Sequence, residues 1–402
     1  MQLSDDRPAL AHGLAAGRSG DISTKPRPDL ICLSHLRWDF VWQRPQHLMS
    51  RFARDRRVFF VEEPIWKDTE PRLEVSEGKG GVMVAVPHLP HELSPEQAEA
   101  AQGELLREML EQHEIAEYVL WYYTPMAIPC TAGLEPLGVV YDCMDELSLF
   151  RGAPRELLDR ESKLLAAADL VFTGGQSLYE AKRERHPRVH PFPSSIEAEH
   201  FRQARAACSE PADQAALPRP RMGYFGVIDE RLDLDLVAAV ADARPDWQIV
   251  MVGPVVKIDP ESLPRRANLH YLGMKGYADL PLYLAGWDVA LMPFAQNEST
   301  RFISPTKTPE YLAGGRPVVS TPIRDVVKPY GEEKMVEIAD GPQGFVAAIE
   351  RALSGYGEGW LDRVDEFLSH GSWSRTWREM SDLIDAAVAS RREGSRRDLP
   401  VL

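Results

Sequence analysis

Short apolar runs alternate with amphipathic stretches from Asp29 onward, and this alternation continues through both halves of the chain. The apolar runs are residues 30–34, 58–62, 82–86, 118–122, 138–142, 170–173, 221–228, 248–252, 269–272, 288–292 and 317–320. Strands that are apolar on both faces and alternate with helices form parallel sheets covered on both sides. The sequence therefore predicts an α/β fold with two doubly wound parallel sheets.

Amphipathic stretches with helical spacing lie between the apolar runs. They cover residues 46–54, 95–111, 155–167, 177–185, 233–243, 277–285 and 309–313, and two more follow at 342–354 and 373–390. Ligands of doubly wound sheets bind outside the carboxyl ends of the strands. We therefore expect the two sheets to face one site in a cleft between them.

The interval from 206 to 220 interrupts the alternation, since it is rich in alanine, proline and charge. Such a composition is typical of a linker between domains. We expect a flexible polar leader at 1–27, a first domain at 28–205, the linker at 206–220, a second domain at 221–372, a last helix at 373–390 and a basic tail at 391–402.

Charge and hydropathy exclude several classes of protein. The 402 residues carry a net charge of −15, and nucleic-acid binding requires a basic surface instead. No apolar run approaches the roughly 18 residues of a membrane span, and the N-terminus is acidic where a secretory signal is basic. We expect a cytoplasmic protein, whose basic end at 391–397 is either solvated or in peripheral contact with the anionic inner membrane face.

Cysteine usage gives no sign of a metal site or a disulfide framework. The four cysteines are far apart in sequence and form no C-x-x-C pair. No Cys and His residues cluster with the spacing of zinc ligands. We expect reduced core cysteines, no bound metal and no resident cofactor.

The stretch from 293 to 317 combines a strand end, a short helix and a second strand. Thr308 is a good N-cap, Pro309 suits the first helical position, and Glu310 then falls in the first turn. A helix start beside Lys307 is suited to phosphate, and an ionised Glu310 can accept hydrogen bonds from both ribose hydroxyls. The alternative is that Glu310 only complements the helix dipole and that Lys307 is a surface charge.

A second candidate phosphate site follows the first strand of the second half. Gly226 ends that strand and lets the backbone approach an anion. Arg231, five residues later, can bind a diphosphate with two parallel hydrogen bonds. Taken alone the signal is weak, because many strand-to-helix turns contain glycine and arginine.

The loop after the first strand carries polar and aromatic side chains to the same edge of the sheet. Its polar residues, expected around the cleft, are His35, Arg37, Asp39, Arg44 and His47. Trp38 and Trp42 either stack on a sugar or pack in the core, whereas core packing is favoured for Phe52.

Two carboxylates, Asp142 and Asp145, follow another strand of the first half. Either can act as a general base if its pKa suits the reaction. The alternative for Asp142 is that it caps a helix, a position that aspartate favours.

Four segments in this order resemble bacterial group 1 glycosyltransferases of the GT-B fold, similar in pattern to those of teichuronic-acid and exopolysaccharide pathways. They are S-H-L-R-W-D-F-V-W-Q-R-P-Q-H-L (34–48), Y-D-C-M-D-E (141–146), G-V-I-D-E-R-L-D-L-D-L (226–236) and S-P-T-K-T-P-E-Y-L-A-G-G-R-P-V-V-S-T (304–321). The resemblance covers roughly residues 29–390. It implies two Rossmann-like domains, a nucleotide-sugar donor and a glycan or lipid-linked acceptor. We expect the donor to be a UDP-sugar.

The resemblance also implies roles for individual residues. On the donor side it places Glu310 at the ribose, Lys307 and Arg231 at the diphosphate, and Gly226, Thr306, Ser304 and Glu298 around them. Candidate catalytic residues at the rim of the first domain are Asp142, Asp145, His35 and Asp39, with Arg44, His47 and Trp38 on the acceptor side. The last helix, 373–390, is implied to cross back onto the first domain.

The chain departs from the family pattern at four places, one of which is Pro309 inside the K-T-P-E run, a proline expected to shift the helix start by a residue or two. Phe302 stands where many members have a second glutamate, with Glu298 as the nearby substitute; Val227 replaces an arginine; and Ser194-Ser195 replaces Asn-Gly. Two alternatives to a glycosyltransferase are therefore a sugar-nucleotide epimerase or hydrolase of the same fold and a non-catalytic sugar-binding subunit of a polysaccharide assembly complex. A dinucleotide oxidoreductase is disfavoured because no G-x-G-x-x-G opens a strand-to-helix turn.

Overall fold

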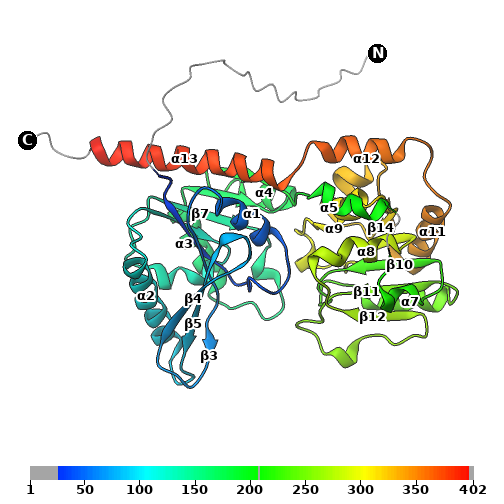
Figure 1. Ribbon diagram of the computed structural model, residues 1–402, viewed down its shortest axis with the longest axis horizontal. Helices are drawn as coiled ribbons and strands as arrows, with labels where there is room; N and C mark the ends of the chain where they lie inside the picture. The colour runs from blue at the N-terminus through cyan, green and yellow to red at the C-terminus, as the bar shows by residue number, and fades with distance from the viewer. Residues whose placement is uncertain (1–25, 207–208, 398–402) are drawn as a thin grey trace, which may run out of the picture.

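The computed structural model describes residues 26–206 and 209–397, which form two α/β domains side by side (Figure 1). The first domain contains strands β1–β9, helices α1–α4 and the last helix, α13; the second contains β10–β15 and α5–α12. The predicted leader lies outside the described residues except for its last two positions, and so do residues 398–402 of the predicted tail. The α/β prediction is confirmed.

The sheet of the first domain has the order β3-β5-β2-β1-β6-β7-β8-β9, with β4 paired to β5. Its strands are β1 (Asp29–Leu33), β2 (Val58–Val61), β3 (Ile65–Trp66), β4 (Arg72–Glu77), β5 (Met83–Leu89), β6 (Tyr118–Tyr122), β7 (Gly138–Cys143), β8 (Leu170–Thr173) and β9 (Val189–Pro191). All pairs are parallel except β4–β5. The central strand β1 is buried along its whole length, as an apolar parallel strand must be.

Helices α1 (Arg44–Phe52), α2 (Pro95–Gln112), α3 (Leu157–Ala167), α4 (Gln176–Lys182) and α13 (Trp373–Arg397) belong to this domain. Helix α2 begins where the sequence predicts, since Ser94 and Gln97 form a capping box and Pro95 takes the first helical position. Within the described residues, no helix is both long enough and apolar enough to cross a membrane.

The sheet of the second domain is wholly parallel, with the order β12-β11-β10-β13-β14-β15. Its strands are β10 (Arg221–Phe225), β11 (Gln248–Val252), β12 (Leu269–Gly273), β13 (Val289–Met292), β14 (Val318–Ser320) and β15 (Glu337–Ile338). Its helices are α5 (Ala198–Arg202), α6 (Ala212–Ala215), α7 (Leu234–Ala243), α8 (Leu280–Ala285), α9 (Lys307–Ala313), α10 (Arg324–Val326), α11 (Gly341–Leu353) and α12 (Trp360–Ser369).

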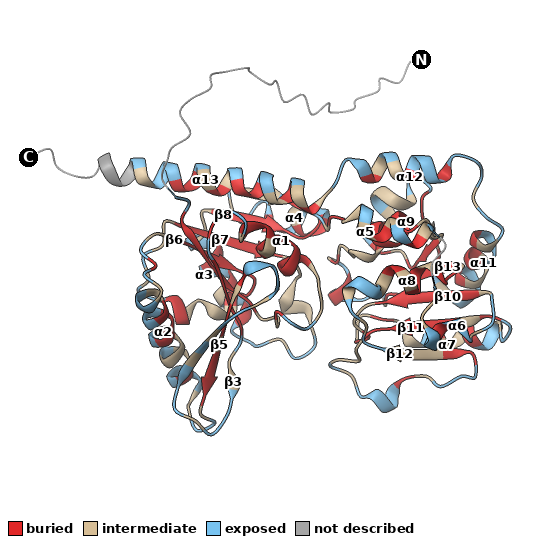
Figure 2. Cartoon of the chain, viewed as in Figure 1, coloured by how far each residue is buried: buried red, intermediate tan, exposed pale blue. Residues whose placement is uncertain are grey.

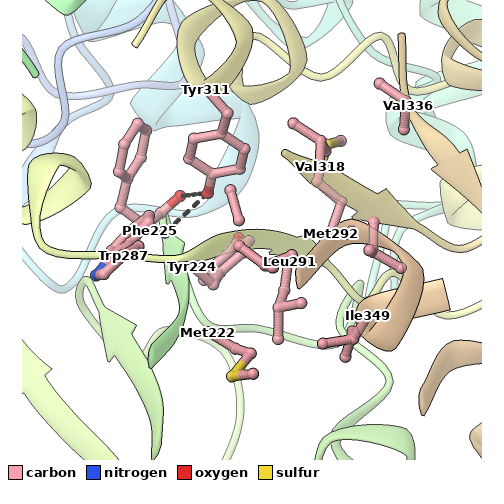
Figure 3. Close-up of a cluster of buried hydrophobic side chains, with 14 of the residues drawn as sticks. Met222, Tyr224, Phe225, Trp287, Leu291, Met292, Tyr311, Val318, Val336 and Ile349 are labelled. Carbon is pink, nitrogen blue, oxygen red and sulfur yellow. Dashed lines mark hydrogen bonds between the residues drawn. The ribbon is translucent and has the colours of Figure 1, made fainter. Parts of the chain in front are cut away.

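An aromatic cluster fixes helix α9 against strand β10 (Figure 3). The Tyr311 hydroxyl accepts a hydrogen bond from the Phe225 backbone N–H at 2.9 Å, and the two rings lie edge to face at 4.7 Å. The Trp287 ring fills the space beside Gly223, where a Cβ would lie 1.9 Å from it. Because Tyr311 is anchored to the end of β10, its neighbour Glu310 is brought to the carboxyl edge of the sheet.

The chain crosses from the first hydrophobic core to the second between Phe192 and Ile196, so the predicted boundary at residue 205 is wrong. Phe201 of α5 stacks on Phe225 of β10 at 5.9 Å and therefore belongs to the second domain. The predicted linker also packs on that domain, since Gln214 is buried and accepts a hydrogen bond from the Trp287 indole at 2.8 Å. A polar amide hidden this way needs such a partner, and the composition of the segment did not reveal it.

Helix α13 crosses back onto the first domain. The chain returns between Leu368, in the second core, and Trp373, in the first. The buried residues of α13 face the first sheet (Figure 2), and they include Met380, Ile384 and Val388. The helix continues to Arg397, so the described part of the predicted tail is helical.

Candidate functional site

A pocket of about 260 Å³ lies between the two domains and is called the cleft pocket below. Its wall on the first domain is the loop between β1 and α1, residues 38–43, together with Lys79. Its wall on the second domain contains Gly226, Arg231, Lys307 and Glu310. The first and last of these four predicted donor-side residues are 84 positions apart in the sequence, and all four line the same pocket.

Helix α9 places Lys307 and Glu310 one turn apart on the cleft pocket. The helix starts at Lys307 after an N-cap at Thr306, so the predicted start, with Thr308 as cap, is two residues too late. Glu310 is 7% exposed, and its carboxylate accepts no hydrogen bond from any residue that the structure describes. Burial raises the pKa of Glu310 to about 8, while the Lys307 ammonium opposes the rise. A sheltered acceptor of this kind suits hydroxyl donors from a ligand.

Gly226 allows Lys307 to lie across the end of β10. Its φ of +143° is a conformation that L side chains rarely adopt. A Cβ at this position would lie 2.1 Å from Cε and 2.7 Å from Nζ of Lys307. The absence of a side chain therefore sets the position of the lysine at the pocket wall.

The Arg231 guanidinium is held in one orientation. It donates hydrogen bonds to both carboxylate oxygens of Asp229, the shortest 2.7 Å long, and it lies 5.7 Å from the centre of the Phe150 ring of the first domain. A guanidinium has five N–H donors, so pairing with Asp229 orients Arg231 without using all of them.

A smaller pocket of about 90 Å³, the inner pocket, shares Arg231, Thr306 and Lys307 with the cleft pocket. Asp145 lines it from the first domain, and Ser304 lines it from the second. Burial raises the pKa of Asp145, and Arg231 opposes this rise. The Ser194 hydroxyl donates to the Ser304 carbonyl at 2.6 Å and ties the crossover to the same wall. Asp145 is thus a carboxylate that faces cations across the domain boundary.

Asp142 is not available as a general base, which corrects one sequence prediction. It is 0% exposed and accepts hydrogen bonds from Nε and Nη2 of Arg44, the shortest 2.8 Å long. Arg44 donates further to the Phe192 carbonyl at 2.6 Å. This buried pair joins α1, β7 and the crossover. Arg44 also lines the inner pocket, so its predicted acceptor-side role stays a prediction.

His47 and Trp38 are both largely buried. The predicted acceptor-side role is wrong for His47, which lines neither pocket, whereas that of Trp38 stays a prediction. His47 is 1% exposed and stacks on Trp373 of α13 at 4.8 Å. Burial lowers the pKa of its imidazole to about 3, so the ring is neutral. Trp38 is 2% exposed and packs edge to face on Phe60, although its edge reaches the cleft pocket.

The remaining predicted residues lie at different depths. Asp39 is exposed on the rim of the cleft pocket, whereas His35 lines neither pocket, and burial together with Lys257 lowers its pKa to about 4. Glu298 is wrongly predicted for the donor side. It sits in a separate surface hollow, 3.8 Å from Arg301.

Sequence reasoning missed Tyr277 and left Trp42 undecided. Both line the cleft pocket from opposite domains, with ring centres 6.1 Å apart. The Tyr277 hydroxyl donates to Glu197 at 3.1 Å, and Arg51 of the first domain holds the same carboxylate at 2.7 Å. Tyr277 falls inside a predicted helix, so only its pairing across the domain boundary distinguishes it.

Among the described residues, no three or more His, Cys, Asp or Glu side chains are grouped to hold a metal ion.

Two sequence comparisons match parts of this chain to glycosyltransferases. Residues 219–355 match the family described as glycosyl transferases group 1. A Bacillus subtilis (strain 168) protein, TuaH, whose name proposes it as a teichuronic acid biosynthesis glycosyltransferase, is 28% identical over 265 residues. That match covers 60% of this chain and 64% of the relative, so the chain spans less than two thirds of its length.

Solved structures of low sequence identity share the fold. Sucrose-phosphate synthase from Thermosynechococcus elongatus has a TM-score of 0.68 at 15% identity, covering 90% of this chain and 100% of that one. Anabaena HepE in complex with UDP-glucose has a TM-score of 0.66 at 11% identity, with the same coverage. The chain has the GT-B fold, and its residues 219–355 form a group 1 glycosyl transferase domain.

Proposed function

We propose that the protein is a glycosyltransferase that moves a sugar from a nucleotide-sugar donor, a UDP-sugar, to a glycan or lipid-linked acceptor of a cell-surface polysaccharide. The observation that carries the proposal is the convergence of Gly226, Arg231, Lys307 and Glu310 on the cleft pocket. The name of the B. subtilis relative supports the polysaccharide role, and the complex of HepE with UDP-glucose supports a UDP-sugar donor.

In this proposal each polar group has a task at the donor. Glu310 accepts hydrogen bonds from the ribose hydroxyls, while Lys307 and Arg231 neutralise the diphosphate. The negative charge on the diphosphate grows as the bond to the sugar breaks, so fixed cations stabilise the transition state more than the bound donor. The donor's anomeric carbon then lies towards the inner pocket, where Asp145 can take the proton of the attacking acceptor hydroxyl.

The proposal includes the environment of the reaction. Cations supplied by side chains perform the charge neutralisation, so we propose that transfer needs no bound metal. We also propose that the enzyme works in the cytoplasm. The C-terminal part of α13, which carries Arg391 and Arg392, gives it peripheral contact with the anionic inner membrane face, where lipid phosphates replace the partners of these arginines in the structure, Asp169 and Glu117.

Titration with UDP tests the donor site directly. Replacing Glu310 with alanine removes its hydrogen bonds to the two ribose hydroxyls, which are worth about 0.5–1.5 kcal/mol each. We expect Glu310→Ala to weaken UDP binding by roughly 10- to 100-fold in calorimetry and to abolish UDP release from UDP-glucose. Glu298→Ala, on the separate hollow, is the control and should bind UDP like the wild type. Equal UDP affinity in Glu310→Ala would refute the assignment.

A further inference from the structure

The loop that follows β7, residues 144–151, reaches the second domain and is called the bridging loop below. It begins at the carboxyl end of β7, where Asp145 lines the inner pocket. It ends at Arg151, whose backbone N–H donates to the Glu230 carboxylate of the second domain at 3.0 Å. Loops at this edge of a parallel sheet lie beside the ligand site. One short segment thus joins the two walls of the cleft.

The start of the bridging loop is fixed inside the first domain. The Lys182 ammonium is 2% exposed and lies 2.6 Å from carboxylate oxygens of both Glu146 and Glu161. Glu161, 1% exposed, also accepts a hydrogen bond from the Tyr141 hydroxyl at 3.0 Å. Charged groups are retained in the interior when they are paired and hydrogen-bonded in this way. Glu146 therefore ties the loop to α3 and α4 at the residue next to Asp145.

The end of the bridging loop presents one aromatic ring to two cations of the second domain. The centre of the half-buried Phe150 ring lies 5.7 Å from the Arg231 guanidinium carbon and 5.3 Å from the Lys257 ammonium. Arg231 follows β10 and Lys257 follows β11, and backbone hydrogen bonds of Ile228 join these two segments. The face of an aromatic ring attracts cations at such distances. Phe150 is therefore held to both segments at once.

The ring contact leaves hydrogen-bond donors of Arg231 free for a ligand. Nε and Nη2 of Arg231 donate to Asp229. Nη1 donates to no residue that the structure describes. An aromatic ring attracts the guanidinium through its π electrons and needs no N–H donor. Phe150 can thus position Arg231 from the first domain while the Nη1 donors remain available to a diphosphate.

We propose that Phe150 is a positioning residue for sugar transfer. Its ring holds the Arg231 guanidinium against the bridging loop, so that this cation and the Asp145 carboxylate lie at the inner pocket in one fixed arrangement. Phe150 lines neither pocket and therefore acts through Arg231. The inference rests on the proposed function and deepens it, because it names a residue that couples the donor side of the cleft to the facing domain.

Variants of Phe150 in the full chain test the proposal through the release of UDP from UDP-glucose. Phe150→Leu keeps the apolar bulk and removes the ring. It should lower kcat about 10- to 100-fold, because a small misplacement of the reacting groups costs that much. UDP affinity in calorimetry should fall no more than about fivefold, the effect of losing one partly exposed cation–ring contact. Phe150→Tyr keeps the ring and should retain most of the wild-type kcat.

Tyr271→Leu is the matched control. The Tyr271 ring lies 5.7 Å from the Arg265 guanidinium, the same distance as in the contact of Phe150 with Arg231, but it lines neither pocket. The control should keep the kcat and the UDP affinity of the wild type. Thermal unfolding of each variant shows that the fold is intact at the assay temperature. Wild-type kcat in Phe150→Leu, or an equal loss of kcat in the control, overturns the proposal.

The pH dependence of kcat gives a readout that a merely structural role would not change. Burial raises the pKa of Asp145, and Arg231 and Lys257, the two cations at the Phe150 ring, oppose this rise. Without the ring both cations can move away, so the pKa of Asp145 should increase. The rise of kcat with pH should then lie at higher pH in Phe150→Leu, and an unchanged profile counts against the proposal. The other charged groups that face Asp145, and that the substitution leaves in place, are Arg44, Asp229 and Lys307.

Amide hydrogen exchange of the UDP-bound chain decides the contact without turnover. Phe150→Leu should speed exchange at residues 144–151 and 226–231 about tenfold, because both segments lose a shared contact, whereas Tyr271→Leu should not. Unchanged exchange in both segments overturns the proposal. If the wild type binds UDP but Phe150→Leu behaves like it, the positioning role fails while the donor site stands. If the wild type does not bind UDP, the proposed function fails and the positioning role with it.

Discussion

The two walls of the cleft are built in different ways. The wall on the second domain consists of short segments that follow strands directly, and each functional side chain is anchored by a neighbour in sequence: Tyr311 fixes Glu310, Asp229 orients Arg231, and Gly226 leaves room for Lys307. The wall on the first domain is a longer aromatic loop, and the polar residues predicted around it divide between the pocket rim, where Asp39 lies, and the core, where Arg44 and His47 of α1 lie. A short motif can thus specify the nucleotide side, whereas the facing side depends on contacts between distant segments.

The largest expected effect concerns Asp145, the carboxylate of the first domain that lines the inner pocket. Asp145→Asn should lower kcat by about 10²- to 10⁴-fold, as loss of a general base does, while UDP affinity stays unchanged. A general base must be ionised, and burial raises the pKa of Asp145. The wild-type rate should therefore rise with pH above the ordinary aspartate range, and the residual rate of the variant should lose this dependence. A variant that retains full kcat would remove Asp145 from the mechanism.

The buried pair in the first domain should matter for stability. Arg44→Met leaves the Asp142 carboxylate buried without its partner, which costs about 3–5 kcal/mol. Urea denaturation should show this loss in the free energy of unfolding. Arg391→Met breaks an exposed pair with Asp169 and should cost less than about 1 kcal/mol. If the two variants are equally stable, the pair does not hold the domain together as described.

A smaller effect is expected at the glycine beneath Lys307. Gly226→Ala places a methyl group against the lysine and should weaken UDP binding about tenfold, which is about 1.4 kcal/mol. Gly133→Ala is a matched control, since Gly133 also has a positive φ of +81° but no atom within 4 Å of its Cβ position. Both substitutions place a side chain at a positive φ and so strain the backbone. A difference in UDP affinity between the two variants therefore measures the effect of displacing Lys307. Equal affinities would show that the position of Lys307 is not set by Gly226.

The fold was largely predictable because most strands are apolar on both faces. The ranges 118–122, 170–173 and 248–252 match β6, β8 and β11 residue for residue. Strand β4 was missed because it is antiparallel and mostly exposed, and its sequence R-L-E-V-S-E has only two apolar residues, Leu73 and Val75. Helix α12 was also missed, and the domain boundary was placed too late in the chain. Phe201 and Leu368 belong to the second domain, but only their packing in its core reveals this.

In the candidate site, too, local sequence features were predictable and contacts between distant segments were not. Lys307, Glu310, Gly226 and Arg231 were placed from local spacing and from the family resemblance, and the structure brings them together. Asp142 was misjudged because its partner Arg44 lies 98 residues away, and nothing near Asp142 in sequence marks the pair. His47 was misjudged for the same reason, since its stacking partner Trp373 belongs to the last helix.

A crystal structure of the full chain with UDP is the most direct test of the nucleotide site. We expect both ribose hydroxyls within hydrogen-bond distance of the Glu310 carboxylate, and the diphosphate in contact with Lys307 and Arg231. UDP bound elsewhere, or bound in the cleft pocket with its ribose away from Glu310, would contradict this assignment.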